Sequence, residues 1–156
     1  MNIVIANRQR TKKINTRLLK QIVNELLAEL KISEAELGIN LVAAPEMILV
    51  NETFLKHTGS TDVITFDYTD KTEGTILAGE IFICVDDAIL QAKKFKTKWQ
   101  SEIVRYVIHG ILHLIGHDDL KSKSRNKMKL EENRLLRGIA KKFSLAQIGG
   151  GSKLRV

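Results

Sequence analysis

The sequence predicts a single α+β domain, with a small, mostly antiparallel or mixed sheet and helices packed around it. The chain has 156 residues, which fits one domain, and 44% of them are hydrophobic, enough for a buried core. Short apolar runs typical of strands are interspersed with segments whose apolar residues recur every three or four positions, as in helices. No repeat or long linker divides the chain, so we expect one domain at 1–145 and a flexible tail at 146–156.

The first two elements are a strand and a helix. Residues 3–6 form an apolar run that predicts the strand. Asn15 or Thr16 can then accept a hydrogen bond from the first turn of a helix, which we expect to reach about Lys31. Leucine, isoleucine and valine recur through this segment at spacings of three and four, so one face of the helix is predicted to be buried.

A second strand is predicted at 36–43, where apolar residues predominate. The single proline, Pro45, follows it and suits the first turn of a short helix that reaches about Lys56. Residues 62–68 then alternate polar with apolar side chains, which is typical of a half-buried strand, and a polar loop is expected at 69–75.

The apolar run at 78–85 predicts a further strand. Asp86 or Asp87 can cap the helix that follows it, and this helix ends near Lys98. A last helix is expected from about Ser122, after the helix described below.

Basic residues give the chain a formal net charge of +7, and they gather in three clusters. The clusters are Arg8, Arg10, Lys12, Lys13, Arg17 and Lys20; Lys93, Lys94, Lys96 and Lys98; and Lys121, Lys123, Arg125, Lys127, Lys129, Arg134, Arg137, Lys141 and Lys142. Such clusters fit a polyanionic partner such as a nucleic acid, since each neutralised phosphate releases condensed counterions. Solvated helix faces look the same in sequence, so charge alone leaves both interpretations open.

Two further features bear on the compartment and on the kind of site. No apolar stretch approaches the roughly 18 residues typical of a membrane span, and the start of the chain lacks a secretory signal pattern, so we expect a cytoplasmic protein. The only cysteine, Cys84, lies in an apolar run, which predicts a buried side chain. A single cysteine excludes an internal disulfide and a zinc site built mainly from thiolates.

The residues that carry chemistry concentrate on a helix that begins at about Ser101. Set at about 100° per residue, its isoleucine, valine and leucine residues share one broad arc, and His109 and His113 lie on the opposite side with Glu102 and Tyr106. Two imidazoles four residues apart stand one above the other, about 6 Å apart in rise. Both rings can reach one ion, which predicts a metal-binding helix at the centre of the fold.

A third ligand has to come from beyond this helix, since a tetrahedral ion needs ligands that converge from different directions. On a straight helix, His117 would lie about 12 Å along the axis from His109. Gly116 can end the helix, because glycine readily adopts the left-handed conformation, and the chain can then turn back. We therefore prefer Asp119 to His117 as the third ligand, with a fourth position left for water or substrate.

Two other interpretations of the histidines have to be weighed. Histidines at this spacing also occur as ordinary surface or core residues, but the glycine and the acidic residues that follow favour a metal site. The spacing is also that of a metallopeptidase helix, in which a glutamate after the first histidine takes a proton from metal-bound water. Here that residue is Gly110, so a metallopeptidase is the weaker alternative.

The same stretch resembles the signature of the YbeY family of bacterial ribosomal RNA maturation endoribonucleases, His-Gly-x-Leu-His-Leu-x-Gly-Tyr-Asp-His. The matching residues are His109, Gly110, Leu112, His113, Leu114, Gly116 and Asp118. Residues 51–54 and 61–66 resemble the family's Asn-x-x-Tyr and Thr-Asp-Val-Leu-Ser-Phe segments, and residues 78–81 resemble its Gly-Asp-Ile strand. The resemblance extends from about Leu49 to Leu120.

Three positions depart from the family pattern. His117 stands in place of the family's tyrosine, and Asp119 in place of its third metal histidine. A carboxylate is a harder ligand than imidazole, so metal affinity and preference can differ from the family's zinc. Leu55 stands where the family usually has an arginine that acts on RNA, and the adjacent Lys56 offers only a point charge for RNA binding.

The resemblance implies a zinc-dependent, single-strand-specific endoribonuclease that acts in ribosomal RNA maturation and ribosome quality control. One Zn²⁺, or another divalent ion, would be held by His109, His113 and Asp119. The resemblance also implies ribosomal RNA as the partner, together with ribosomal proteins and an assembly GTPase, and no membrane.

The general base is left open by the sequence, and the candidates are His117, Asp118 and Glu80. Besides the metallopeptidase, one more alternative stands. It is a ribosome assembly factor that catalyses little and holds its metal structurally, which a closed site with His117 as a further ligand would favour.

Overall fold

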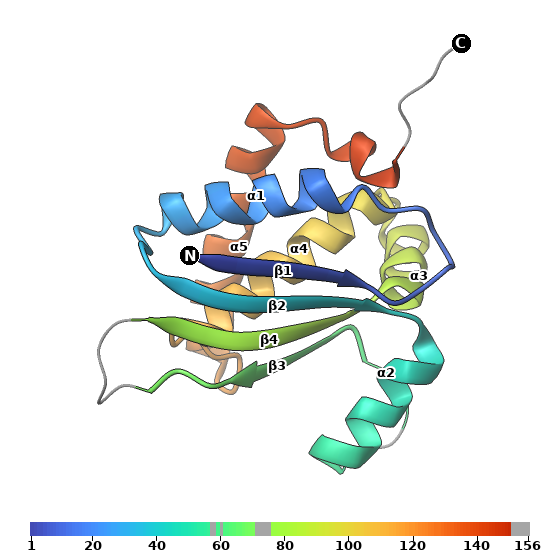
Figure 1. The fold of residues 1–156 in the computed structure, drawn as a ribbon, viewed down its shortest axis with the longest axis horizontal. Coiled ribbons are helices and arrows are strands. Elements are labelled where there is room, and N and C mark those ends of the chain that lie inside the picture. The colour runs from blue at the N-terminus through green and yellow to red at the C-terminus, as the bar shows by residue number, and fades with distance from the viewer. Residues whose placement is uncertain (57–58, 60, 71–75, 151–156) are drawn as a thin grey trace.

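The computed structural model describes residues 1–56, 59, 61–70 and 76–150, and every strand and helix expected from the sequence is present among them (Figure 1). The elements in chain order are β1 (Asn2–Asn7), α1 (Thr16–Glu29), β2 (Ala35–Val42), α2 (Ala44–Val50), a π-helical turn η1 (Asn51–Leu55), β3 (Val63–Asp67), β4 (Leu77–Cys84), α3 (Val85–Phe95), α4 (Trp99–Leu114), α5 (Ser122–Lys142) and a 3₁₀ helix η2 (Leu145–Gly149).

The strands of the described residues form one sheet in the order β1-β2-β4-β3. β1 pairs with β2 and β2 with β4 in parallel, whereas β3 pairs with β4 in an antiparallel way. The sheet is therefore mixed, and it is not mostly antiparallel. The crossover between β1 and β2 contains α1, and a crossover that carries a helix is what parallel pairing requires.

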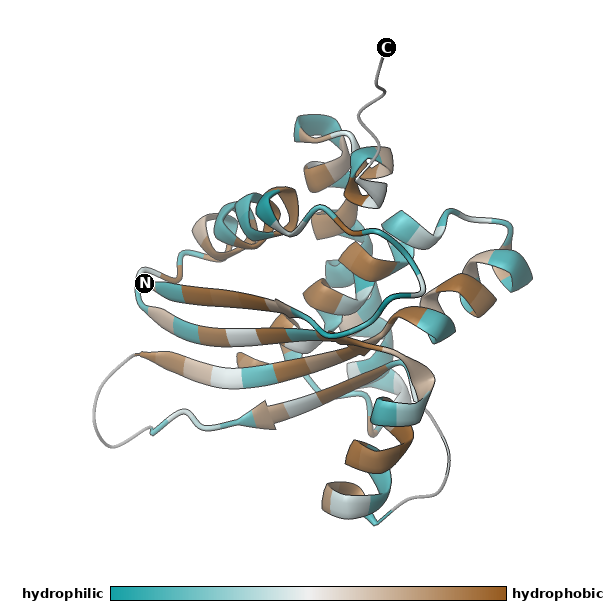
Figure 2. Cartoon of the chain, turned by 45° about the vertical axis from the view of Figure 1, so that its right-hand side comes forward, coloured by the Kyte–Doolittle hydropathy of each residue, from teal (hydrophilic) through white to brown (hydrophobic). Residues whose placement is uncertain are grey.

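Helices α1 and α4 cover one face of the sheet, and α5 packs against them (Figures 1 and 2). The side chains between these layers form the main core, which confirms the buried faces expected for both helices. Its fully buried members include Leu19, Ile22, Leu26 and Leu27 of α1, Ile39, Leu41, Ile81 and Ile83 of the sheet, and Ile103, Ile108 and Ile111 of α4. Burial on this scale is the main favourable term for folding.

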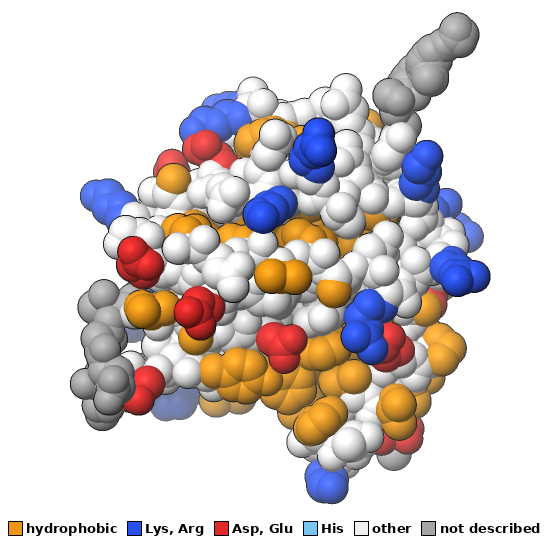
Figure 3. Space-filling model, in the orientation of Figure 1, with side chains coloured by type: hydrophobic (Ala, Val, Ile, Leu, Met, Phe, Trp, Pro, Cys, Tyr) orange, Lys and Arg blue, Asp and Glu red, His pale blue; other side chains and the backbone are white. Residues whose placement is uncertain are grey.

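Among the described residues, α2 and η1 cover one end of the opposite face of the sheet (Figure 1). A second, smaller core joins Met47 and Val50 of α2 to Ile64 and to the buried Cys84. Figure 3 looks onto this side of the molecule, where hydrophobic side chains follow the strands and no histidine is visible. The histidines of α4 belong to the covered side.

Two glycines let α4 approach the sheet closely. A Cβ atom at Gly110 would lie 2.7 Å from Cγ2 of the buried Ile81. A Cβ atom at Gly79 of β4 would lie 2.6 Å from the backbone oxygen of Phe66 and 2.8 Å from Cδ2 of Leu114. Because these separations are shorter than real Cβ contacts, any larger residue would push α4 away from β4. The glycines thereby set the height of the histidines above the sheet.

The starts of three helices test the expected caps. The side chain of Asn15 accepts a hydrogen bond from the backbone N–H of Leu18, which confirms it as the cap of α1. Neither Asp86 nor Asp87 caps α3, because that helix already begins at Val85. The carboxylate of Asp86 instead accepts from the backbone N–H of Ala44 at 2.6 Å, at the start of α2.

The other boundaries differ slightly from expectation. Helix α4 begins two residues before Ser101, at Trp99. The chain beyond 145 is not all tail, because η2 buries the side chain of Ile148 completely in the main core. Residues 71–75 of the expected loop and 151–156 of the expected tail lie outside the described residues.

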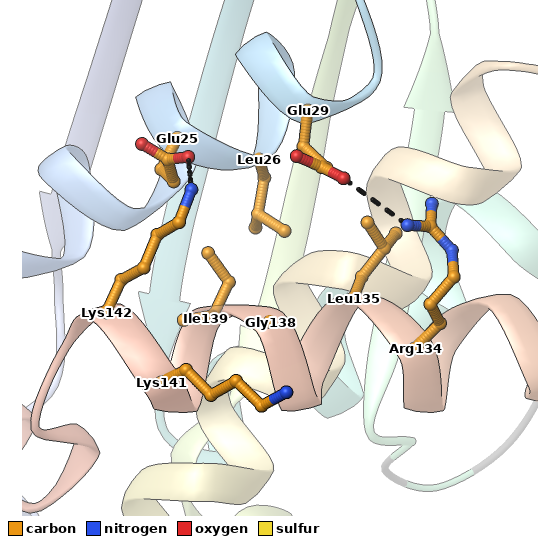
Figure 4. Close-up of a pocket in the computed structure, with 9 residues that line it drawn as sticks. All are labelled: Glu25, Leu26, Glu29, Arg134, Leu135, Gly138, Ile139, Lys141 and Lys142. Carbon is orange, nitrogen blue, oxygen red and sulfur yellow. Dashed lines mark hydrogen bonds and ion pairs between the residues drawn. The ribbon is translucent and has the colours of Figure 1, made fainter.

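A groove between α1 and α5 is bridged by ion pairs (Figure 4). Lys142 Nζ lies 2.6 Å from Glu25 Oε2, and Arg134 Nη1 lies 3.4 Å from Glu29 Oε1. Gly138 lies between these pairs on α5, and apart from its chain neighbours and the nearby backbone of its own helix no atom lies within 4 Å of the position that a Cβ would take. Within the described residues, no helix is long and apolar enough to cross a membrane.

Candidate metal centre

The end of α4 brings three donors to one place, as the sequence predicted. The helix ends at Leu114, and Gly116 has a φ of 107°, the left-handed conformation expected there. The backbone N–H of His117 donates to the carbonyl of Leu112, which closes the turn. The chain then runs back, and Asp119 lies beside the two histidines of the helix.

The distances within this cluster fit a single ion. Nε2 of His109 and Nε2 of His113 are 3.1 Å apart, and Oδ2 of Asp119 lies 3.9 Å and 3.8 Å from them. Ligands about 2.0–2.1 Å from a tetrahedral ion are about 3.3 Å apart, so small shifts would place one ion within reach of all three. His109, His113 and Asp119 form the only such group of potential metal ligands among the described residues.

The second nitrogen of each histidine ring has a partner that fixes the tautomer. Nδ1 of His109 lies 2.9 Å from Oε2 of Glu132, and Nδ1 of His113 lies 3.1 Å from the backbone oxygen of His117. Both partners are acceptors, so in each neutral ring Nδ1 carries the proton and Nε2 presents a lone pair. Two lone pairs that face each other at 3.1 Å repel unless a proton or a metal ion lies between them. The donor set therefore fits a cation.

Glu132 is a candidate functional residue that the sequence did not single out. It is buried on α5, and its other oxygen accepts from Nη1 of Arg105 at 3.0 Å. Arg105 also donates to the side chain of Asn133 at 2.8 Å. A carboxylate that orients a metal-binding histidine is a frequent partner in metalloproteins, where it also raises the basicity of the ring. Glu132 is the residue in this chain that is placed to do so.

The pKa values of the two histidines move in opposite directions. Burial disfavours a charge on His109, but the hydrogen bond and the charge of Glu132 outweigh it and raise the pKa of this ring. Burial and the neighbouring charge of His109 lower the pKa of His113. A metal ion bound here would compete with protons for both ring nitrogens.

Two pockets meet at the cluster. The helix pocket lies among α3, α4 and α5 and has a volume of about 360 Å³. The strand pocket lies between α4 and β3, with a volume of about 390 Å³, and Leu55 lines it. Asp62, His109 and Asp119 line both pockets, so a donor cluster at their junction is open to ligands from two sides.

His117 and Asp118, two of the candidates for the general base, lie together away from this junction. Both line a separate pocket with Ser124 and Lys127. The carboxylate of Asp118 accepts from the Ser124 hydroxyl at 2.8 Å and from the backbone N–H of Leu120, and these bonds lower its pKa. The backbone oxygen of His117 accepts from Nδ1 of His113, whereas the His117 side chain is not one of the three grouped donors.

Glu80 and Lys56 are also not brought to the cluster. Glu80 follows Gly79 on β4 and faces the side of the sheet opposite α4, where its carboxylate accepts from the Tyr68 hydroxyl at 3.2 Å. Successive residues of a strand face opposite sides of the sheet, and because Gly79 and Ile81 face α4, Glu80 faces away from it. Lys56 ends η1 in the left-handed conformation, is exposed, and lines neither pocket at the cluster.

A helix that holds two histidines over a mixed sheet, with a carboxylate returning after a glycine, defines a candidate metal-dependent hydrolase. The sequence profile of one family, described as Endoribonuclease YbeY, matches residues 4–140. The chain belongs to this family of RNA-cleaving hydrolases, and the resemblance inferred from the sequence is confirmed.

Individual relatives agree with this assignment. A protein of Azobacteroides pseudotrichonymphae named Endoribonuclease YbeY is 34% identical over 128 residues, which cover 82% of this chain and 87% of that protein. A protein of the same name from Chlorobium phaeovibrioides is 38% identical over 88 residues, and the matched part spans only 57% of its length. The solution structure of a Thermotoga maritima protein shares the fold, with a TM-score of 0.67, 23% identity and 97% of both chains covered.

Proposed function

We propose that this chain is a zinc-dependent endoribonuclease that cleaves single-stranded regions of ribosomal RNA during ribosomal RNA maturation and ribosome quality control. The observation that carries the proposal is the cluster of His109, His113 and Asp119 at the junction of two pockets, in a member of an endoribonuclease family. Zinc is favoured because two imidazoles and a carboxylate are a common ligand set of catalytic zinc, with other divalent ions as alternatives.

Each residue of the site has a distinct role in this proposal. His109, His113 and Asp119 hold the ion through Nε2, Nε2 and a carboxylate oxygen, and Glu132 keeps the His109 ring in the tautomer that presents Nε2. A zinc ion held by these residues would supply Lewis acidity toward a phosphodiester and would make water more acidic. Asp62 lines both pockets, and it replaces Glu80 in this proposal as the carboxylate that accepts a proton.

The two alternative functions receive less support. Three donors leave a position for substrate, whereas a structural zinc site is closed by four protein ligands. A metallopeptidase needs a glutamate at position 110, and a side chain there would collide with Ile81. An assembly factor that catalyses nothing therefore remains only as one outcome of the experiment below.

The distribution of charge supports an RNA partner. Helix α5 carries much of the C-terminal basic cluster and borders the helix pocket through Arg125 and Lys129. With ribosomal RNA as substrate, a cytoplasmic location follows, and ribosomal proteins and an assembly GTPase are the further partners that we propose.

The test is a cleavage assay on a labelled single-stranded RNA. Protein as purified, protein stripped with a chelator and protein reloaded with zinc are compared, with His113→Ala as the inactive control. We expect cleavage that is lost with the metal, returns with zinc and is absent in the variant. Intact RNA in the presence of stoichiometric bound zinc would instead identify a non-catalytic assembly factor.

A further inference from the structure

The helix pocket has chemistry that binding of the metal alone does not use. It shares Asp62, His109 and Asp119 with the strand pocket, so the cluster lies where the two meet. A linear polymer whose reacting group lies at the cluster would place one neighbouring unit in each pocket. At about 360 Å³, the helix pocket falls within the range of about 300–1,000 Å³ that is usual for small-molecule sites.

The cations at the cluster are on one side only. Arg105, Arg125 and Lys129 line the helix pocket, whereas the described residues that line the strand pocket include no lysine or arginine. Arg105 is engaged by Glu132 and Asn133. Arg125 donates to the backbone oxygen of Asp119 at 3.3 Å, and within the described part of the chain neither it nor Lys129 forms an ion pair. These two side chains can therefore meet an anion.

Tyr106, whose hydroxyl is buried, is one of the residues that line the same pocket. Tyr106 is 5% exposed, and its hydroxyl is the one buried side-chain polar atom without a hydrogen-bond partner among the described residues. A buried hydroxyl that gives up water without a replacement costs free energy, so an unpaired one in a pocket points to a ligand. Tyr106 is thus both a member of the main core and a residue of the pocket wall.

The charges around Tyr106 indicate what its hydroxyl would bind. Burial first, and then the negative charges of Asp62 and Glu102, raise the pKa of Tyr106 well above its ordinary value. The hydroxyl therefore keeps its proton and acts as a donor. The same carboxylates would repel a phosphate at this depth, so the acceptor is a neutral oxygen and the phosphate lies toward α5.

We propose that the helix pocket is a nucleotide subsite, which rests on the proposed endoribonuclease function. It binds the nucleotide that flanks the scissile phosphodiester of a single-stranded RNA. Arg125 and Lys129 contact the phosphate of this nucleotide at the rim, and the Tyr106 hydroxyl donates to a ribose or base oxygen inside.

The first test is Tyr106→Phe in the zinc-loaded, full-length chain. We expect kcat/KM for cleavage of a short single-stranded RNA to fall by about tenfold, mainly through KM, because one hydrogen bond to the substrate is lost. Zinc content should be unchanged, and the unfolding temperature should stay equal or rise, since the free protein offers the hydroxyl no partner. A lower unfolding temperature would show a partner within the fold and overturn the proposal.

The second test uses two lysines of the same helix. Lys129 lines the helix pocket, and Lys127 lines the pocket of His117, so Lys129→Ala and Lys127→Ala remove the same charge from different sites. We expect Lys129→Ala to raise KM several-fold and to flatten its dependence on salt, while Lys127→Ala changes both little. If the two variants change KM equally, only the overall charge of the helix matters and the proposed subsite is wrong.

The two proposals fail in different ways. If the zinc-loaded wild-type chain does not cleave RNA, the proposed function is wrong and the subsite falls with it. If the wild type cleaves and both Tyr106→Phe and Lys129→Ala match it, only the subsite is wrong. A loss in Tyr106→Phe that is seen with RNA but not with binding of the matching DNA would assign the contact to the ribose hydroxyl.

Discussion

Helix α5 contributes to two regions with opposite charge balance, the groove between α1 and α5 and the donor cluster at the end of α4. In the groove, each of two carboxylates of α1 faces a cation of α5, as Lys142 with Glu25 and Arg134 with Glu29 (Figure 4). At the cluster, two imidazole lone pairs and the carboxylate of Asp119 converge with no cation of the chain between them. Glu132, which supports the cluster, and Arg134, which spans the groove, are only two residues apart on α5.

The difference separates interactions that are complete within the fold from those that await a ligand. The two ion pairs in the groove join groups of opposite charge within the fold. At the cluster, the two imidazole lone pairs and the Asp119 carboxylate repel one another unless a cation lies between them. Substitutions in the groove should therefore change stability alone, and those at the cluster should change metal binding.

The largest effect is expected from the third ligand. Asp119→Ala should weaken zinc binding by more than about 100-fold and abolish RNA cleavage, since a direct ligand counts for more than the residues behind it. His117→Ala is the matched control and should bind zinc as the wild type does, because only its backbone oxygen contacts the cluster. Titration with a competing chelator measures both, and the reverse ranking would make His117 the ligand.

Glu132→Gln should have the next largest effect. Zinc affinity is expected to fall by about 10- to 100-fold, because the neutral amide no longer fixes and polarises the His109 ring. Glu131→Gln, one residue away and paired with Arg134, should leave zinc affinity unchanged. If the two variants bind zinc equally, Glu132 has no role behind the metal.

Two glycine substitutions compare packing in the two regions. Gly110→Ala should lower the free energy of unfolding by about 1–3 kcal/mol, because its Cβ would collide with Ile81. Gly138→Ala should raise it by about 1 kcal/mol, since the groove leaves room and alanine favours a helix. Urea denaturation measures both, and RNA cleavage should be impaired only by Gly110→Ala.

The smallest effect concerns pH and the groove. The hydrogen bond that Lys142 donates to Glu25 raises the pKa of the lysine above its ordinary value, so this pair stabilises the folded state below that value and its contribution disappears as pH rises through the raised pKa. Glu25→Gln should therefore be slightly less stable than the wild type at neutral pH. The difference should shrink to zero in strongly alkaline solution, and a difference that persists there would assign it to packing.

The sequence was sufficient for much of the metal centre, because the relevant signals are local. The spacing of His109 and His113 alone places them on one helix face, and Gly116 indicates where the helix ends. These two facts favour Asp119 over His117 as the third donor without settling the choice, and the structure groups Asp119 with the two histidines.

Features that depend on contacts between distant segments were predicted less well. Glu80 was a candidate base, but the register of β4 turns it to the other face of the sheet. Parallel pairing of β1, β2 and β4 depends on crossovers that strand patterns do not encode. The preference of Asp86 for the start of α2 could not be inferred either, since position 44 is remote in sequence.

Glu132 had a signal that was overlooked. The apolar residues of α5 that face the core are Met128, Leu135 and Ile139, and position 132 continues their spacing of three and four. A carboxylate on such a buried stripe needs a partner, because an unpaired buried charge is costly. The pattern therefore indicated a buried ion pair, although not that His109 and Arg105 would form it.

The contact between Gly110 and Ile81 also constrains how this helix can evolve. A lineage that acquires a glutamate at position 110 first needs a smaller residue at position 81, because the new side chain has no room above the isoleucine. Shortening Ile81 alone leaves a cavity in the core, which is harmful by itself. Each substitution is expected to destabilise the fold without the other, so this single contact opposes a glutamate at position 110.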